Sequence, residues 1–237
     1  MTPQLNDALD WAMDGTERVR AALAGLGEDD GAWLADSGLP GWTRKHLVAH
    51  LAGNAGALGN LVSWALTGVE TPMYASPDQR NADIAAGAQR PASELSAWFE
   101  SSAAALAGGW RSLADEQWEA PVKTVQGRIV PVSQTPWLRA REVMVHAVDL
   151  GTGVTFAQLP EAFLVALVDD IVTRRNTIGG PALVIAPDGL EERWAVTGAG
   201  EPVTVAGPLA EVAAWLAGRP ASGLRAEGGL PDLPAWL

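Results

Sequence analysis

The chain has 237 residues, of which 48% are hydrophobic and 19% charged; its net charge is −12 and it contains no cysteine. These totals are typical of a compact globular protein with one large domain or two small ones. The acidic balance argues against nucleic acid and anionic membranes as partners, and the lack of cysteine excludes disulfides, Cys-bound zinc and a Cys nucleophile.

The chain carries no pattern for membrane insertion or export. No run approaches the roughly 18 apolar residues of a membrane span, and the first four residues lack the basic and apolar regions of a signal peptide. We therefore expect a cytoplasmic protein. Any thiol chemistry in this cysteine-free chain would need a thiol from outside the protein.

The N-terminal segment predicts one long amphipathic helix. Thr2 and Pro3 suit a helix cap followed by proline in the first turn, and apolar residues then recur near helical spacing over about residues 3–24. Gly25 suits the end of this helix, and residues 31–41 are predicted to form a loop.

The second predicted helix carries two histidines. Thr43 is a good N-cap, and the helix extends over about residues 44–67, ending before Gly68. His50 lies one turn after His46 and close to apolar residues, so we expect its side chain to point inward. His46 lies in the first turn and is expected at the end of a helix bundle.

Further helices and a hairpin complete the first part of the chain. The predicted elements are a short helix from Pro77 to about Ala86 that carries Arg80, a helix from Pro91 to about Gly108, a hairpin with strands at 122–125 and 128–132, and a helix over about 136–150. The last of these carries Glu142 and His146 and is expected to stop at Gly151.

The pattern changes after Gly153. We expect a helix over about 160–177, short strands near 183–185, 193–196 and 203–205, a helix over 208–217, and a final strand near 224–226. This predicts an α+β half and hence two domains, 1–153 and 154–237. A cleft between domains is a usual place for a ligand.

Glu142 and His146 are four residues apart, so on a helix both side chains lie on one face. Together with a distant histidine, such a pair indicates a zinc site with three protein ligands and an open fourth position, although the same ligands suit iron. The only histidines, His46, His50 and His146, lie on two predicted helices, and bundles build metal sites from facing helices. The alternative is a surface Glu142 and a hydrogen-bonded core histidine. Asp149 either orients His146 or is a solvated carboxylate.

Several arginines lie near these segments and could bind carboxylates, because a guanidinium holds a carboxylate with two parallel hydrogen bonds. The candidates are Arg80, Arg128, Arg139, Arg141 and Arg219. Each by itself is more often a surface residue. Arg219 follows the last predicted helix, a position that can project toward another domain.

Several stretches resemble the mycothiol-dependent maleylpyruvate isomerase family. They are GWTRKHLVAH at 41–50 with Asn54, then 64–68, 70–74, 126–128, REVMVHAVDL at 141–150, 217–219 and 234–237. The resemblance covers nearly the whole chain, whereas the histidine stretches alone match only the wider DinB-like superfamily of metal-binding helical bundles. It implies an α+β protein, in which an N-terminal DinB-like four-helix bundle holds zinc and a smaller α+β C-terminal domain closes over it.

The resemblance also implies a site and a reaction. It places the zinc ligands on His50, Glu142 and His146, and it gives Arg80 and Arg219 roles in binding cofactor or substrate, with Arg219 also catalytic. The implied reaction is the cis–trans isomerisation of maleylpyruvate to fumarylpyruvate in gentisate degradation. A zinc-activated thiolate of mycothiol would add to the double bond, the bond would rotate, and the thiolate would leave. Mycothiol and maleylpyruvate are thus the expected partners of a protein that we expect to be monomeric.

Two other functions stay open. One is a mycothiol S-transferase or a metal-dependent hydrolase on the same bundle, which an assay of mycothiol with a chlorinated aromatic would distinguish. The other is a non-enzymatic metal- or thiol-binding module, which would bind ligands without turning over either substrate.

Overall fold

The computed structural model describes residues 3–27 and 29–236, and the chain divides into two compact units. The larger unit is Gln4–Val154, and the smaller covers the described chain from Thr155 onward. Helices and small sheets together make the predicted α+β class. No helix within the described ranges is long and apolar enough to cross a membrane.

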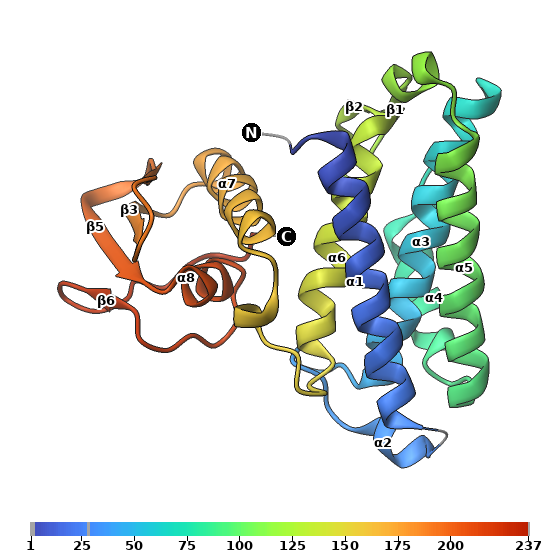
Figure 1. Ribbon diagram of the computed structural model, residues 1–237, viewed down its shortest axis with the longest axis horizontal. Coiled ribbons are helices and arrows are strands. Elements are labelled where there is room, and N and C mark those ends of the chain that lie inside the picture. The colour runs from blue at the N-terminus through green and yellow to red at the C-terminus, as the bar shows by residue number, and fades with distance from the viewer. Residues whose placement is uncertain (1–2, 28, 237) are drawn as a thin grey trace. The chain divides into compact units, whose positions relative to one another are not determined.

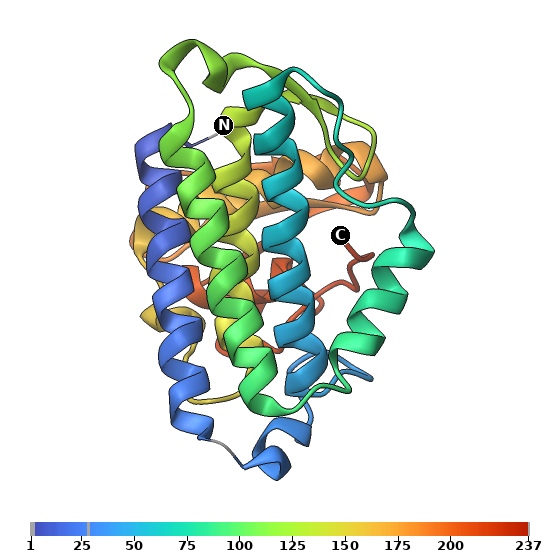
Figure 2. The same cartoon turned by 90° about the vertical axis from the view of Figure 1, so that its right-hand side faces the viewer.

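The larger unit is a helical bundle. Its long helices are α1 (Leu5–Leu26), α3 (Arg44–Thr67), α5 (Ala92–Ser112) and α6 (Thr135–Asp149), which run side by side (Figures 1 and 2). α1 packs against α6 and α3 packs against α5, while the shorter α4 (Pro77–Gly87) packs on α3. The predicted four-helix bundle is therefore confirmed.

α3 has the predicted start and end. It follows Thr43 and stops before Gly68, whose φ of 72° is left-handed and whose N–H donates to the Trp64 carbonyl at 2.8 Å. Glycine adopts this conformation without the steric cost that a Cβ brings. The apolar face of α3 is fully buried and includes Leu47, Leu51, Leu58 and Leu61.

The core of the bundle joins the helices that carry the candidate site. Leu47 and Leu51 of α3 are buried in one cluster with Leu95 and Phe99 of α5 and Val143 of α6. Each such side chain contributes about 1.5–3 kcal/mol when it is fully buried. The same contacts that stabilise the bundle therefore hold α3 and α6 next to each other.

The ends of α1 differ from the prediction. The helix begins at Leu5 rather than at Pro3, and Thr2, the predicted cap, lies outside the described residues. It ends at Leu26, beyond the predicted stop, because Leu26 still packs against the core. Gly27 then supplies the positive φ, 64°, that ends the helix.

The segment predicted as a loop after α1 contains a short helix, α2 (Asp30–Leu34). The Asp29 carboxylate caps this helix by accepting a hydrogen bond from the Gly31 N–H at 3.0 Å. Trp33 of this helix is buried, and its Nε1 donates to the Gly27 carbonyl at 3.0 Å. The prediction of a loop here was wrong because it gave weight to glycine and none to the Asp cap.

α5 also extends beyond its predicted end at Gly108. A Cβ at Gly109 would lie 3.0 Å from Val62 Cγ1, so glycine here lets α5 pack closely on α3. The next residue, Trp110, is buried and donates from Nε1 to Thr135 Oγ1 at 2.9 Å. Gly109 therefore serves packing, and neither Gly108 nor Gly109 ends the helix.

A small hairpin connects α5 to α6. The elements are η1 (Asp115–Glu119), β1 (Pro121–Lys123), β2 (Ile129–Pro131) and η2 (Val132–Gln134). β1 and β2 pair antiparallel with Val122 opposite Val130, which confirms the predicted hairpin. Its strands are shorter than predicted because residues 124–128 belong to the turn, in which the Gly127 N–H donates to the Thr124 carbonyl at 2.9 Å.

The smaller unit combines two helices with a sheet. Its elements are η3 (Phe156–Gln158), α7 (Glu161–Ile178), β3 (Pro181–Pro187), β4 (Trp194–Val196), β5 (Ala199–Gly207), α8 (Leu209–Leu216) and β6 (Arg225–Ala226). The strand order is β4-β3-β5-β6, with β3 and β5 parallel and the other pairs antiparallel. Buried Arg175 of α7 donates to the carbonyls of Leu216 and Pro234 at 2.8 and 3.0 Å. The predicted helices and strands of this half are confirmed.

Candidate metal centre

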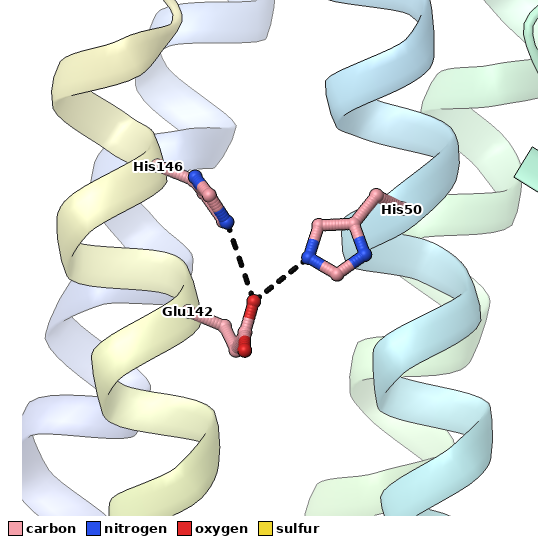
Figure 3. Close-up of side chains that lie close together, drawn as sticks. All are labelled: His50, Glu142 and His146. Atoms are coloured by element: carbon pink, nitrogen blue, oxygen red, sulfur yellow. Dashed lines mark hydrogen bonds and ion pairs between the residues drawn. The ribbon is translucent and has the colours of Figure 1, made fainter. Parts of the chain in front are cut away.

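α3 and α6 bring three potential metal ligands together (Figure 3). Glu142 Oε2 lies 2.8 Å from His50 Nε2 and 3.3 Å from His146 Nε2. One ligand atom from each side chain lies within 4.8 Å of the other two. The two imidazole rings are 5.2 Å apart and nearly perpendicular, at 84°. We call His50, Glu142 and His146 the donor set.

The two helices place the donor set as their sequences predict. Glu142 and His146 are one turn apart on α6 and point to the same side (Figure 3). His50 points inward from α3 and is only 5% exposed, which confirms its predicted orientation. Glu142 and His146 are partly buried, so the donor set stays reachable from outside the core.

His46 has a different role from His50. It lies in the first turn of α3, where its Nδ1 accepts a hydrogen bond from the Thr43 N–H at 3.3 Å and lies 2.8 Å from Thr43 Oγ1. A side chain in the third helical position that returns to the cap residue satisfies a backbone donor at the helix start. His46 is therefore part of the cap of α3 and stands outside the donor set.

Asp149 contacts the donor set from behind His146. Its Oδ2 lies 2.8 Å from His146 Nδ1, and the carboxylate side chain is 2% exposed. The Asp149 carbonyl accepts a hydrogen bond from the Gly38 N–H at 2.6 Å, which holds this end of α6. The structure thus favours the orienting role over a solvated carboxylate.

Arg80 and Trp42 contact the other histidine. Arg80, on α4, donates from Nη2 to His50 Nδ1 at 3.3 Å. Its guanidinium carbon lies 5.8 Å from the centre of the Tyr74 ring. The Trp42 ring packs against His50 edge to face, with centroids 5.6 Å apart. His50 is therefore enclosed by an aromatic ring on one side and a cation on another.

The charges within the site keep Glu142 and His50 in the forms that bind a metal, while they favour the protonated form of His146. Burial lowers the pKa of His50, and the attraction of Glu142 offsets this only in part. Burial opposes the charge on Glu142, but the charges and hydrogen bonds of His50 and His146 hold its pKa well below the usual carboxyl range. Burial also opposes charge on His146, yet hydrogen bonds to Asp149 and Glu142 raise its pKa. An ionised carboxylate and a neutral His50 imidazole are the forms that bind a metal.

Arg139 connects the two helices of the site. It lies one turn before Glu142 on α6 and is 1% exposed. Its Nη1 donates to the Leu51 carbonyl at 2.7 Å and to Asn54 Oδ1 at 2.9 Å, both on α3. Leu51 follows His50 directly, so this buried cation ties the α3 backbone next to one donor to the α6 turn that bears the others.

The donor set fits a zinc ion by its chemistry. Two imidazole nitrogens and one carboxylate oxygen are a ligand combination of catalytic zinc sites, where a fourth position stays open. Asp149 also supplies the carboxylate that commonly accepts from the other nitrogen of a ligating imidazole. The same donors suit iron. The residues therefore indicate a metal site but do not identify the metal.

A cavity of about 520 Å³ adjoins the donor set at His50. Its wall includes Arg80 and Tyr74, together with parts of α3, α4 and α5. Burial raises the pKa of Tyr74, which keeps its hydroxyl protonated. A cavity beside an open metal site is where a ligand of that site would be expected.

The other predicted arginines lie in different places. Arg128 is exposed in the hairpin and Arg141 is partly buried on α6. Arg219 follows α8 in the smaller unit, where its N–H donates to the Ala214 carbonyl at 2.8 Å. The predicted roles of Arg219 in cofactor binding and catalysis stay predictions.

Trp42 was not among the predicted site residues, and the contacts of Arg139 with α3 were not predicted. Trp42 directly precedes the cap of α3, and the aromatic residue at that position was read only as part of a longer stretch. Arg139 was one of several arginines, but it alone is three residues before Glu142 on the same helical face. That spacing was the available signal.

Comparisons with known proteins agree with this geometry. The family model described as the mycothiol maleylpyruvate isomerase N-terminal domain matches residues 12–151. Two crystal structures of a mycothiol-dependent maleylpyruvate isomerase, one carrying a histidine-to-alanine mutation, each share 39% sequence identity with the chain. Each has a TM-score of 0.93 and covers 99% of this chain and 98% of its own. The comparison with curated proteins found no match.

Proposed function

Because the chain belongs to the mycothiol maleylpyruvate isomerase family, we propose that it isomerises maleylpyruvate to fumarylpyruvate with mycothiol as its cofactor. The observation that carries the proposal is the donor set, which lies in the part of the chain that the family model matches. A related enzyme of 39% identity over almost the whole chain bears the same activity in its name. Cytoplasmic location and a monomeric state remain predictions.

We propose that the donor set holds zinc through His50 Nε2, Glu142 and His146 Nε2. Zinc at such a site lowers the pKa of a thiol, and thiols isomerise conjugated cis double bonds by reversible addition, which leaves a single bond free to rotate. The cysteine-free chain has no thiol of its own. A cofactor that brings one therefore fits both the composition and the open donor set.

The residues around the donor set support this chemistry. Arg80 lies next to His50 and could hold a substrate carboxylate while offsetting negative charge that develops on the conjugated ketone. Trp42 covers one side of His50 and limits the access of water. Asp149 holds His146 with Nε2 toward Glu142. For Arg219, the proposed role is to bind substrate or cofactor and to act in catalysis.

The decisive experiment follows the absorbance of maleylpyruvate with and without mycothiol, on metal-loaded and on chelated protein. Conversion is expected only when both metal and mycothiol are present. His50→Ala and Glu142→Ala should abolish it and should lower the metal content. His46→Ala is the matched control, because it removes a histidine one turn away that only caps α3.

Two results would contradict the proposal. Full activity in Glu142→Ala would remove the donor set from the mechanism. Consumption of a chlorinated aromatic with mycothiol, without any turnover of maleylpyruvate, would instead make the protein a mycothiol S-transferase on the same bundle.

A further inference from the structure

The cavity beside His50 has few side-chain atoms on the side formed by α3, which we call its floor. Between His50 and Asn60, α3 contributes only Ala52, Gly53, Gly56 and Ala57 to the lining. A Cβ built on Gly53 or on Gly56 would meet no atom within 4 Å. Both glycines therefore face open space, unlike Gly109, whose Cβ would press against Val62.

These two glycines are not explained by packing or by backbone conformation. They lie inside α3 and neither has a positive φ. In a helix interior, glycine is about 1 kcal/mol less favourable than alanine. Gly53 and Gly56 differ from Gly59 of the same helix in that they line the cavity, and they leave its α3 side free of side chains.

The opposite wall of the cavity is polar and carries both signs of charge. α4 supplies Gln79 and Asp83, whose side chains are joined by a hydrogen bond of 2.7 Å. Arg90 follows α4, and its guanidinium carbon lies 4.5 Å from the centre of the Trp98 ring. Carboxylate, amide and guanidinium groups together offer donors and acceptors to hydroxyls.

The cavity is held open by contacts of its own. Asn60 donates from Nδ2 to the Pro72 carbonyl at 3.0 Å, which ties the segment before α4 to α3. At the other end, a Cβ on Gly87 would lie 2.8 Å from Ala49 Cβ and 2.9 Å from Trp98 Cζ3, so α4 closes tightly there. A cavity built in this way needs little rearrangement when it binds a ligand.

The size of the cavity distinguishes the two ligands of the proposed reaction. Maleylpyruvate is a short dianion, whereas a cavity of about 520 Å³ is in the range that holds drug-sized ligands. Mycothiol joins N-acetylcysteine through an amide to glucosaminyl-inositol, so beyond its thiol it is uncharged and rich in hydroxyls. The polar wall and the bare floor suit that part of the cofactor.

We propose that this cavity binds the glucosaminyl-inositol part of the thiol cofactor, and that Gly53 and Gly56 are the specificity-determining residues that admit it. The inference rests on the proposed function for the identity of the thiol. The His50 end of the cavity then receives the cysteinyl part, next to the donor set. A side chain on the floor would exclude the polyol while leaving the donor set intact.

The test compares Gly56→Gln with Gly59→Gln. Gly59 is on the same helix and its Cβ would also meet nothing within 4 Å, but it does not line the cavity. Both variants should keep or raise Tm, since glutamine is the better helix former. Calorimetry with S-methylmycothiol, which has no free thiol, should show binding weakened about tenfold or more in Gly56→Gln and unchanged in Gly59→Gln.

Kinetics supply the second readout. The KM for mycothiol should rise in Gly56→Gln while the KM for maleylpyruvate stays the same, and N-acetylcysteine, which lacks the polyol, should be used equally by both variants. Equal binding of S-methylmycothiol by the two variants would overturn the inference, as would a raised KM for maleylpyruvate alone. If Gly56→Gln weakens the binding of S-methylmycothiol and Gly59→Gln does not, but maleylpyruvate is not isomerised, the proposed function fails and the cavity assignment stands.

Discussion

Asp149 Oδ2 lies 2.8 Å from His146 Nδ1, and this contact turns the other ring nitrogen, Nε2, toward Glu142. An imidazole that donates from Nδ1 to a carboxylate presents a lone pair at Nε2. The carboxylate is 2% exposed, so water competes little for it. The orientation of one metal ligand therefore depends on a residue three positions further along the same helix.

Asp149→Asn is expected to lower zinc affinity by about 10–100-fold, the range seen when such supporting carboxylates are removed. The asparagine can still accept a hydrogen bond, but it no longer stabilises the ligand by its charge. Competition with a chelating dye measures the affinity directly. Asp10→Asn, an exposed change on α1, is the control; equal affinities in the two variants would refute the orienting role.

Arg139→Met should lower the free energy of unfolding by about 2–3 kcal/mol, since the Leu51 carbonyl and Asn54 Oδ1 both lose a charged donor. Burial already lowers the pKa of Arg139 to about 10, which shows how far it is removed from water. Urea denaturation of the chelated protein measures the change. Asn54→Leu in the same chain should recover part of the loss, because a buried amide without its partner is then gone. A lower free energy of unfolding in the Arg139→Met/Asn54→Leu double variant than in Arg139→Met would contradict the stabilising role of these hydrogen bonds.

Arg80→Ala should reduce kcat/KM by about tenfold or more, because it removes a cation next to His50 that can hold a carboxylate. Arg80→Lys should recover only part of the activity, since lysine keeps the charge without the two-pronged geometry. Metal content should not change in either variant. Arg111→Ala, at an exposed position of α5, provides the comparison; a wild-type rate in Arg80→Ala would exclude a role in turnover.

His46→Ala is expected to cost about 1 kcal/mol of stability, as the loss of a helix cap does. The Thr43 N–H loses its acceptor at the start of α3, while the donor set one turn further is unaffected. Thermal unfolding and metal analysis of the same samples provide the two measurements. Metal loss in His46→Ala comparable to that in His50→Ala would place both histidines in the site.

Much of the fold could be predicted because local signals agree with tertiary packing. Thr43 and Gly68 bound α3 as expected, and Gly127 lies in the predicted hairpin turn. One error, the predicted end of α5 at Gly108, occurs where a neighbouring glycine has another use. Gly109 allows close packing of two helices, which no pattern along one segment reveals.

The candidate site was also predicted only in part. The spacing of Glu142 and His146 predicts a pair on one helical face, and the structure brings them together with His50. The sequence predicts an inward His50, but the assignment of His50 rather than His46 as a metal ligand came from the family resemblance, because both histidines lie on one helix. The burial of Arg139 and the empty floor at Gly53 and Gly56 depend on contacts between segments far apart in sequence.

All three donors and Asp149 lie within Gln4–Val154, and the family model spans residues 12–151 of this same unit. The donor set and the carboxylate that supports it thus lie in one contiguous stretch of the sequence. Such a stretch can be inherited, duplicated or fused to a new partner without rebuilding the metal site. A change in what surrounds the bundle can therefore leave the donor set intact.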